Sequence, residues 1–354
     1  MEQTKRFAGL DGLRAVFCIG IVIYHVKEPF DAAFSEWLDP VYRYGGYFGN
    51  YIFFMLSGLL TAYHYKNRMI NQKCSFRIFM AKKIAKIYPL YFCSNLCILL
   101  LDRAIPDPKR LLATCLMIST GWFDGKAMPY NFPAWFLCIL LLLYMLYCLI
   151  GKISSRIPKL YLPLCILVMV WGMILMIGDW NVPFNYRTCG EGYLNFFLGV
   201  LLAELLLSGS VKQEILSAVN LLIFSGSIIS VCLFGLETVS GYGGWIFSCL
   251  CANLICMALY GKYLVRLLTL PPLQIIGKVS FSIYLWHIPV VRAYLLAENQ
   301  LCLSALSEAQ KFILYFLILI VLSVLSYYCF EKRVLEITRL LPRHGKSGEK
   351  RRRS

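Results

Sequence analysis

Long apolar runs recur along the chain and are separated by short polar stretches. Each of the longer runs approaches the length at which an α-helix crosses a bilayer, about 20 residues. They cover 10–27, 46–65, 86–102, 134–151, 160–178, 191–208, 216–235, 243–261, 279–297 and 312–330. The run 111–121 is shorter, which predicts a re-entrant or interfacial piece. The pattern therefore predicts an all-α, polytopic transmembrane helix bundle with about ten spanning helices.

Basic residues in the connecting stretches predict how this bundle lies in the membrane. With the N-terminus inside, the stretches 66–86 and 152–159 fall on the cytoplasmic side, and neither contains an acidic residue. Their basic residues are Lys66, Arg68, Lys73, Arg77, Lys82, Lys83, Lys86, Lys152, Arg156 and Lys159. The outer connections carry acidic residues instead, namely Glu28, Asp31, Glu36, Asp39, Asp179 and Glu191. Because loops rich in lysine and arginine stay inside, both termini are predicted to be cytoplasmic.

Composition supports a membrane protein and excludes several other classes. Hydrophobic residues make up 59% of the 354 residues and charged residues 15%, which is too apolar for a soluble domain of this size. The net charge of +16 resides largely in the inner stretches and the tail, so it predicts contact with membrane lipid and no nucleic acid partner. The 15 cysteines show no CxxC pair, so neither a disulfide framework nor a metal site is expected. We expect one membrane domain over 1–335 and a basic cytoplasmic tail over 336–354.

Two ionisable residues lie within the first apolar run, LDGLRAVFCIGIVIYHV. Arg14 and His25 are eleven residues apart, which places both on one helix face, about 16 Å apart along the axis. Ionisable groups inside a membrane usually serve a function. Arginine binds phosphate in a bidentate way, and histidine commonly deprotonates hydroxyl groups. The pair predicts a donor whose phosphorylated head is held at Arg14 while its long arm reaches His25. The alternative is that both groups only pair with carbonyls or neighbouring helices.

Two further segments extend this hypothesis. In KKIAKIYPLY, Lys83 and Lys86 are three residues apart on one helix face, where they either extend a phosphate site or anchor the helix at the inner surface. The segment GYFGNYIFFMLSGLLTAYHY carries small residues that permit close helix packing or exposure of backbone to a ligand. They are Gly45, Gly46, Gly49, Ser57 and Gly58.

Candidate groups also occur late in the chain. His287 lies in SFSIYLWHIPVV, and it is either a supporting site residue or a satisfied core histidine. Glu331, in SYYCFEKRV, pairs either with Lys332 or Arg333 at the interface or with a cation of the site. The chain has neither a GxSxG serine signature nor a nucleotide-binding glycine loop, and it shows no histidine and carboxylate cluster with metal spacing. Serine hydrolase, ATPase and metalloenzyme functions are therefore disfavoured.

Five motifs occur in a characteristic order: FAGLDGLRAVFCIGIVIYHV, FFMLSG, KKIAKIYPLY, SFSIYLWHIPVV and FEKRV. Together they resemble the acyltransferase 3 family of integral-membrane O-acyltransferases over roughly residues 5–335. The resemblance implies a ten-helix enzyme that moves an acyl group, often acetyl, from cytoplasmic acyl-CoA to a hydroxyl, typically of a sugar, at the outer face. By this resemblance Arg14 binds the CoA phosphates and His25 is the catalytic histidine. Acyl-CoA is then a co-substrate, and no tightly bound cofactor is implied.

The sequence departs from the family pattern in three respects. Many members have arginines where this chain has Lys83 and Lys86, and lysine contacts phosphate less directionally. Many also carry a glutamate soon after the tryptophan of the fourth helix, whereas Trp135 is followed by FLCILLLLY, so the role of that glutamate is not transferred. The extracellular hydrolase-like domain of some members has no counterpart here, which implies direct action on the acceptor or transfer to a separate extracytoplasmic transferase.

Two functions from different classes follow from the sequence. The first is an O-acyltransferase in which Arg14, with Lys83 and Lys86, holds acyl-CoA and His25 deprotonates a hydroxyl of an extracytoplasmic or lipid-linked glycan. The pantetheine arm is on the order of the 16 Å between Arg14 and His25. The second is a transporter or flippase of a lipid-linked sugar or small anion, with Arg14, His25 and His287 lining its pathway. The sequence shows no inverted repeat, which disfavours the transporter.

Overall fold

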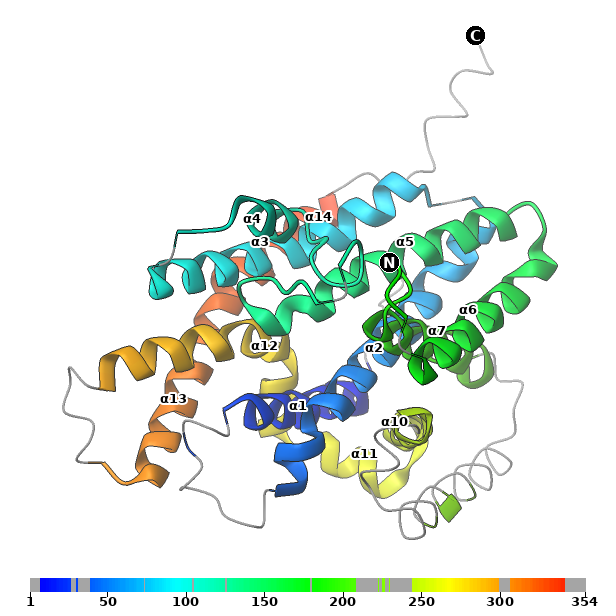
Figure 1. The fold of residues 1–354 in the computed structure, drawn as a ribbon. Coiled ribbons are helices and arrows are strands. Elements are labelled where there is room, and N and C mark those ends of the chain that lie inside the picture. Colours follow the sequence, from blue (N-terminus) through cyan, green and yellow to red (C-terminus); the bar gives the residue numbers. More distant parts are fainter. Residues whose placement is uncertain are drawn as a thin grey trace.

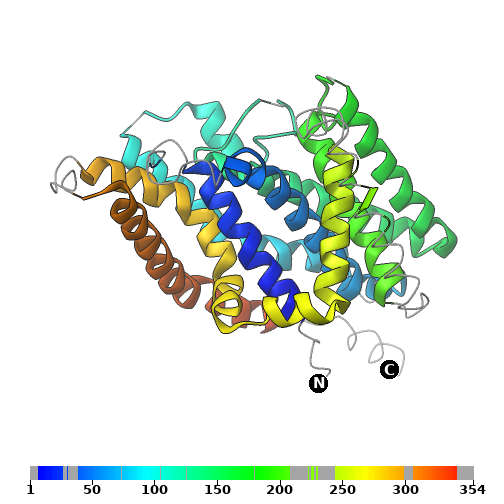
Figure 2. The same ribbon diagram turned by 90° about the horizontal axis from the view of Figure 1, so that it is seen from below.

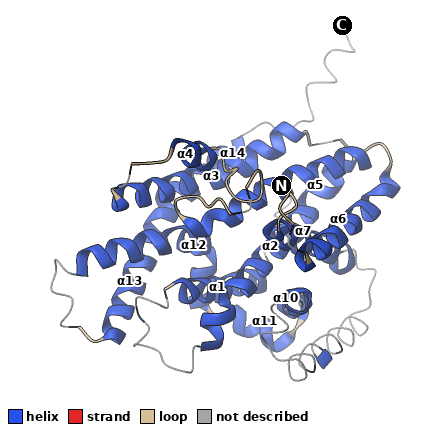
Figure 3. Ribbon diagram, in the orientation of Figure 1, coloured by secondary structure: helices blue, strands red, loops and turns tan. Residues whose placement is uncertain are grey.

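The computed structural model describes residues 7–26, 30, 39–72, 74–103, 105–124, 126–178, 180–207, 222, 225–226, 229, 244–298 and 306–340. Within these ranges the regular secondary structure is helical, and one isolated bridge joins Thr120 to Asp124 (Figure 3). The predicted all-α class is therefore confirmed for the part of the chain that the structure describes.

The helices pack together in one bundle (Figure 1). Those of the first half are α1 (Ala8–His25), α2 (Asp39–Ile70), α3 (Phe76–Asp102), α4 (Pro108–Cys115), η3 (Phe132–Ala134), α5 (Trp135–Ser154) and η4 (Pro158–Leu160). Those of the second half are α6 (Tyr161–Ile177), α7 (Arg187–Leu207), α10 (Gly244–Tyr260), α11 (Lys262–Leu268), α12 (Pro271–Glu298), α13 (Glu308–Ser326), the π-helical η6 (Tyr327–Glu331) and α14 (Lys332–Leu340).

Six helical segments among the described residues are long and apolar enough to cross a membrane. They are Ala8–His25, Phe76–Asp102, Phe132–Ser154, Pro158–Ile177, Pro271–Glu298 and Glu308–Val334. A seventh span results if α10 and α11, bent by 86° at their junction, count as one broken span. The protein is thus a multi-pass membrane protein, but the described residues do not reach the predicted count of about ten.

The number of candidate spans falls short of the predicted ten for identifiable reasons. The predicted spans 46–65 and 191–208 are helical as α2 and α7 but do not pass the same length and hydropathy test. Both helices bury polar side chains inside the bundle, including Thr61 in α2 and Asn195 in α7. Glu191, expected in an outer connection, is likewise buried in α7. The predicted span 216–235 lies outside the described residues except for isolated positions.

The helices also extend further than the apolar runs predicted. The basic stretch 66–86, expected to be an inner loop, is mostly helical, because α2 continues to Ile70 and α3 begins at Phe76. Lysine and arginine favour helices and bury their stems while their charged ends reach the surface. Ser75 caps α3 by accepting a hydrogen bond from the Ile78 amide at 3.4 Å. The run 111–121 holds the second half of the short helix α4 and the turns that follow it, so it forms no spanning helix, and its re-entrant or interfacial position stays a prediction.

Helix α1 lies centrally and packs against α2, α12, α10 and α11 (Figure 2). Glycines allow its close approach to α2. A Cβ atom at Gly45 would meet the carbonyl of Gly20, one at Gly46 would meet the Tyr24 ring, and one at Gly49 would meet Ile21. Further along α2, Gly58 faces the Phe196 backbone of α7. The four glycines of this segment therefore serve helix packing.

Candidate active site

Two histidines meet at the far end of α1. His25 is the last residue of α1, and its Nδ1 lies 3.2 Å from Nε2 of His287 in α12. The two rings stack with centroids 5.1 Å apart. His287 is fully buried, whereas His25 is only partly buried. Phe132 places its ring edge-on against His25, with centroids 5.1 Å apart. His287 is therefore a partner of His25 and not an isolated core histidine.

The hydrogen bonds around His287 assign the protons of this pair. His287 Nδ1 lies 2.6 Å from the carbonyl oxygen of Tyr284, which only accepts hydrogen bonds. A neutral His287 therefore carries its proton on Nδ1, and its Nε2 accepts a hydrogen bond from Nδ1 of His25. In this tautomer His25 Nε2 carries a lone pair and no proton. This nitrogen is the atom of the pair that is able to accept a proton from a substrate.

The backbone around the pair is held by buried polar contacts. Asn131 precedes η3 and donates from Nδ2 to Leu285 O at 2.9 Å and to Ser94 Oγ at 3.0 Å. The Tyr284 hydroxyl donates to the Pro133 carbonyl. These bonds tie the segment that carries Phe132 to α12 and α3, next to the two histidines. The segment that packs against His25 is therefore held by two helices distant in sequence, α3 and α12.

A second cluster, which we call the cation cluster, comprises Arg14, Lys83 and Lys86 near the opposite end of α1. Arg14 forms an ion pair of 3.7 Å with Asp11, one turn earlier on the same helix. Lys86, from α3, interacts electrostatically with Arg14 and Asp11. Lys83 likewise interacts with Arg14 and Lys86. The structure thus brings together the three cations that the sequence analysis selected.

Lys83 is held among hydroxyl and aromatic groups. Its Nζ donates to Thr61 Oγ1 at 2.9 Å and lies 4.2 Å from the centroid of the Tyr144 ring. The Tyr144 hydroxyl in turn faces the hydroxyls of Ser57 and Thr61. Ser57 is therefore near the cation cluster, as a supporting residue would be. Thr61 and Tyr144 were missed by sequence reasoning, because a single hydroxyl in an apolar helix carries no distinctive pattern.

Glu331 lies at the same end of the bundle, on the π-helical segment η6. It is buried, and its Oε1 accepts a hydrogen bond from Ser282 of α12. It also interacts electrostatically with Lys86. Of the two expected pairings, the structure supports the one with a site cation, and among the described residues no salt bridge joins Glu331 to Lys332 or Arg333. π-helical turns often occur at functional sites, and here the turn brings a carboxylate to the cation cluster.

The arrangement separates two kinds of chemistry along one helix. The cation cluster is suited to bind phosphate, with Asp11 and Glu331 balancing part of its charge. The histidine pair is suited to accept a proton at His25. A molecule with a phosphorylated end and a reactive end is able to span both, since their separation along α1 is about 16 Å.

The fold and the site thus define the protein as a membrane helix bundle that carries a histidine pair and a cation cluster. A family described as "Acyltransferase domain" matches residues 7–331. The chain belongs to this family, the acyltransferase 3 family of integral-membrane O-acyltransferases.

Two relatives illustrate the similarity. O-acetyltransferase OatA of Staphylococcus aureus (strain NCTC 8325 / PS 47) is 25% identical over 324 residues, which cover 82% of this chain and 51% of the relative. A putative O-acetyltransferase of S. aureus (strain COL) is 28% identical over 337 residues, covering 82% of this chain and 53% of the relative. The chain spans about half the length of these curated relatives. No solved structure matches the chain.

Proposed function

We propose that the protein is a membrane O-acetyltransferase that moves an acetyl group from cytoplasmic acyl-CoA to a hydroxyl of an extracytoplasmic or lipid-linked glycan. The observation that carries the proposal is the hydrogen-bonded chain from Tyr284 O through His287 to His25. It leaves Nε2 of His25 as a base, on the same helix as a phosphate-binding cation. The names of the relatives support acetyl as the acyl group.

The chemistry requires one base and no change of oxidation state. His25 Nε2 takes the proton of the acceptor hydroxyl while the hydroxyl oxygen bonds to the thioester carbonyl carbon. The carbon–sulfur bond then breaks, the CoA sulfur leaves, and the proton returns from His25 to that sulfur. While His25 carries the proton, its Nδ1–H continues to donate to His287 Nε2, which stabilises the positive charge.

The cation cluster holds the donor head in this scheme. Arg14, Lys83 and Lys86 bind the pyrophosphate of CoA, which removes much of the freedom of the attached thioester. CoA enters and leaves with each turnover as a co-substrate. The basic residues near one end of α2, α3 and α5 support a position of this cluster at the cytoplasmic surface of the cell membrane, with both termini inside.

The proposal is tested with purified protein in nanodiscs, acetyl-labelled acetyl-CoA and a panel of hydroxylated glycans. Wild type is expected to transfer label, and His25→Ala is expected to lower the rate about 10²- to 10⁴-fold while CoA binding persists. His344→Ala, which changes a histidine outside the described residues, is the matched control. Full turnover by His25→Ala would disprove the assigned role.

The remaining outcomes separate the competing functions. Absence of both transfer and CoA binding in wild type, with substrate accumulation in sealed vesicles, would favour a transporter or flippase. Transfer that appears only after a second protein is added would identify a donor module for a separate extracytoplasmic transferase.

A further inference from the structure

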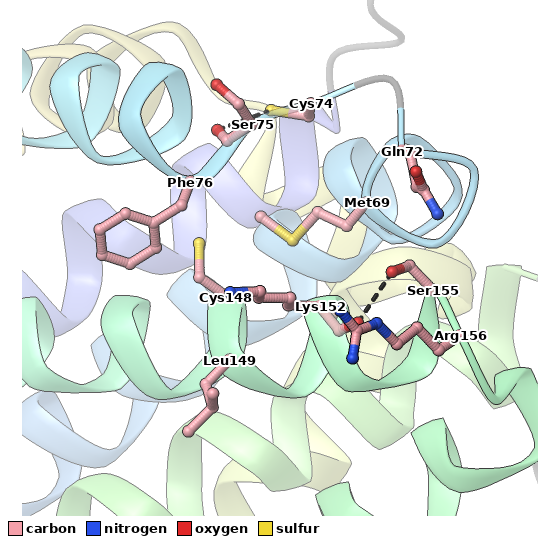
Figure 4. A pocket seen from close by; sticks show the side chains of 11 residues that line it. Met69, Gln72, Cys74, Ser75, Phe76, Cys148, Leu149, Lys152, Ser155 and Arg156 are labelled. Atoms are coloured by element: carbon pink, nitrogen blue, oxygen red, sulfur yellow. Dashed lines mark hydrogen bonds between the residues drawn. The ribbon is translucent and has the colours of Figure 1, made fainter.

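A cavity of about 590 Å³ opens between the inner ends of α2, α3 and α5. Figure 4 shows Lys152 and Arg156 on one side and Met69, Gln72 and Phe76 on the others. It lies outside the two clusters described above, and neither the histidine pair nor the cation cluster contributes to its lining. Its residues have no part in the mechanism so far.

The lining of this cavity is positively charged. Lys152 and Arg156 are its ionised side chains, and none of the residues that line it is acidic. In the described part of the chain no salt bridge neutralises either of them. Burial raises the pKa of the Cys74 thiol, so this group adds no negative charge. The cavity therefore favours an anion, and arginine in particular favours phosphate.

Besides polar residues, the remaining lining contains large apolar side chains. The Phe76 side chain is 50% exposed and Leu149 is 53% exposed, although both are large and hydrophobic. Met69 adds a flexible thioether to the same wall. An aromatic face beside two cations fits a purine ring that carries a phosphate. An inorganic anion or a simple headgroup phosphate would leave this apolar surface unused.

The residues that line the cavity lie close to those around Lys83. Tyr65, Phe79 and Tyr144 surround Lys83 with ring centroids 5.4, 5.3 and 4.2 Å away. The cavity residues Met69, Phe76 and Cys148 lie three or four positions along the same three helices, which is about one turn nearer the inner surface. Cys148 is also within electrostatic range of Lys83. A phosphate site at Lys83 and a phosphate site in the cavity would therefore be adjacent.

We propose that this cavity binds the 3′-phosphorylated adenosine end of CoA, with Lys152 and Arg156 on the 3′-phosphate and Phe76 against the adenine ring. The inference rests on the proposed function, because it assigns the donor's distal end to a site next to the cation cluster. It predicts that the protein distinguishes CoA from 3′-dephospho-CoA, which differs only in the group that Lys152 and Arg156 contact.

The test compares the binding of CoA and 3′-dephospho-CoA to the full chain in nanodiscs of neutral lipid. Wild type is expected to bind CoA about tenfold more tightly, the effect of roughly one charge-assisted contact at an exposed site. The double variant K152Q/R156Q is expected to lose this preference while its affinity for 3′-dephospho-CoA stays unchanged. Lys159→Gln, an exposed lysine on η4 that does not line the cavity, is the matched control.

Each result supports or overturns the inference. Wild type that binds both forms equally, or a double variant that keeps the preference, overturns it and leaves the proposed function intact. Wild type that binds neither form overturns the proposed function itself. Phe76→Ala is expected to weaken binding of both forms alike, and an unchanged affinity would argue against the adenine contact.

A lipid headgroup is the competing source of phosphate. The same proteins are therefore placed in nanodiscs with and without anionic phosphatidylglycerol. If K152Q/R156Q abolishes an effect of anionic lipid on thermal stability but leaves the preference for CoA unchanged, the cavity binds lipid and the inference is wrong. If the preference is lost and the lipid effect persists, the nucleotide assignment holds.

Discussion

At the scale of single residues, the site depends on a hydrogen bond between two groups 262 positions apart, His25 and His287. The sequence was sufficient to select Arg14 and His25, because ionised groups inside an apolar run are costly and therefore informative. It left His287 open between a core role and a site role, since only the fold shows which ring faces which. No pattern in the sequence indicated Asp11, which contacts Arg14, or Ser282, which contacts Glu331.

His287 is expected to act as a positioning residue for His25. Replacing it by alanine removes the acceptor for the Nδ1 proton, so kcat should fall about 10- to 100-fold while KM for acetyl-CoA changes little. His287→Gln offers an amide oxygen at a similar place and should restore part of the rate. Steady-state kinetics of both variants measure this.

A loss of packing alone would give a different result. Tyr315→Phe removes the hydroxyl that donates to the His287 carbonyl at 3.2 Å and serves as the control for local structure. Equal rates for the alanine and glutamine variants, or a rate for Tyr315→Phe as low as theirs, would contradict the positioning role.

Under the proposed function Arg14 binds the donor, so the effect of its replacement should appear in KM. Arg14→Gln is expected to raise KM for acetyl-CoA about tenfold or more, with a smaller change in kcat. Arg14→Lys keeps the charge but not the bidentate geometry and should be intermediate. Arg266→Gln, an exposed arginine in α11, should match wild type. A pure kcat effect for Arg14→Gln would place the arginine at the reacting atoms.

At the scale of elements, glycines decide how closely the helices pack. A Cβ at Gly58 would collide with the Phe196 carbonyl of α7, and one at Gly199 with the Met55 carbonyl of α2. The two helices therefore meet backbone to backbone, as small residues permit in membranes. The small residues were visible in the sequence, but their partners were not, because packing faces depend on helices that the chain brings together from a distance.

Gly58→Ala should destabilise the bundle by about 1–3 kcal/mol, because α2 and α7 must separate to admit the methyl group. Gly20→Ala is the control, since a Cβ there has no atom within 4 Å. Thermal unfolding in detergent compares the two variants with wild type. A Gly58→Ala protein as stable as Gly20→Ala would show that the α2–α7 contact is less tight than described.

At the scale of the whole molecule, the hydrophobic pattern predicted the class well and the lengths of the helices less well. Hydropathy ends a span at the first charges, whereas the lysines of α3 continue the helix to Phe76. Charge bias in turn predicts the orientation of the bundle, which stays a prediction.

This orientation predicts which surfaces an impermeant reagent reaches. Lys109 on α4 and Lys159 on η4 are both exposed, and the topology assigns them to opposite sides of the membrane. A membrane-impermeant maleimide on intact cells should label Lys109→Cys and not Lys159→Cys, and permeabilisation should expose the second. The unsubstituted chain corrects for its own thiols. Labelling of both on intact cells would contradict the topology.

The packing of α1 fixes the distance between the two clusters of the site. Arg14 and His25 are fixed points on one helix, and backbone contacts at Gly9, Gly45 and Gly277 hold that helix between its neighbours. The distance between them therefore cannot adapt to the donor. Under the proposed function, specificity includes length: a thioester on a shorter arm would stop before His25 even when its phosphates are bound correctly. The protein would select its donor by the length of the arm, without contacting most of that arm.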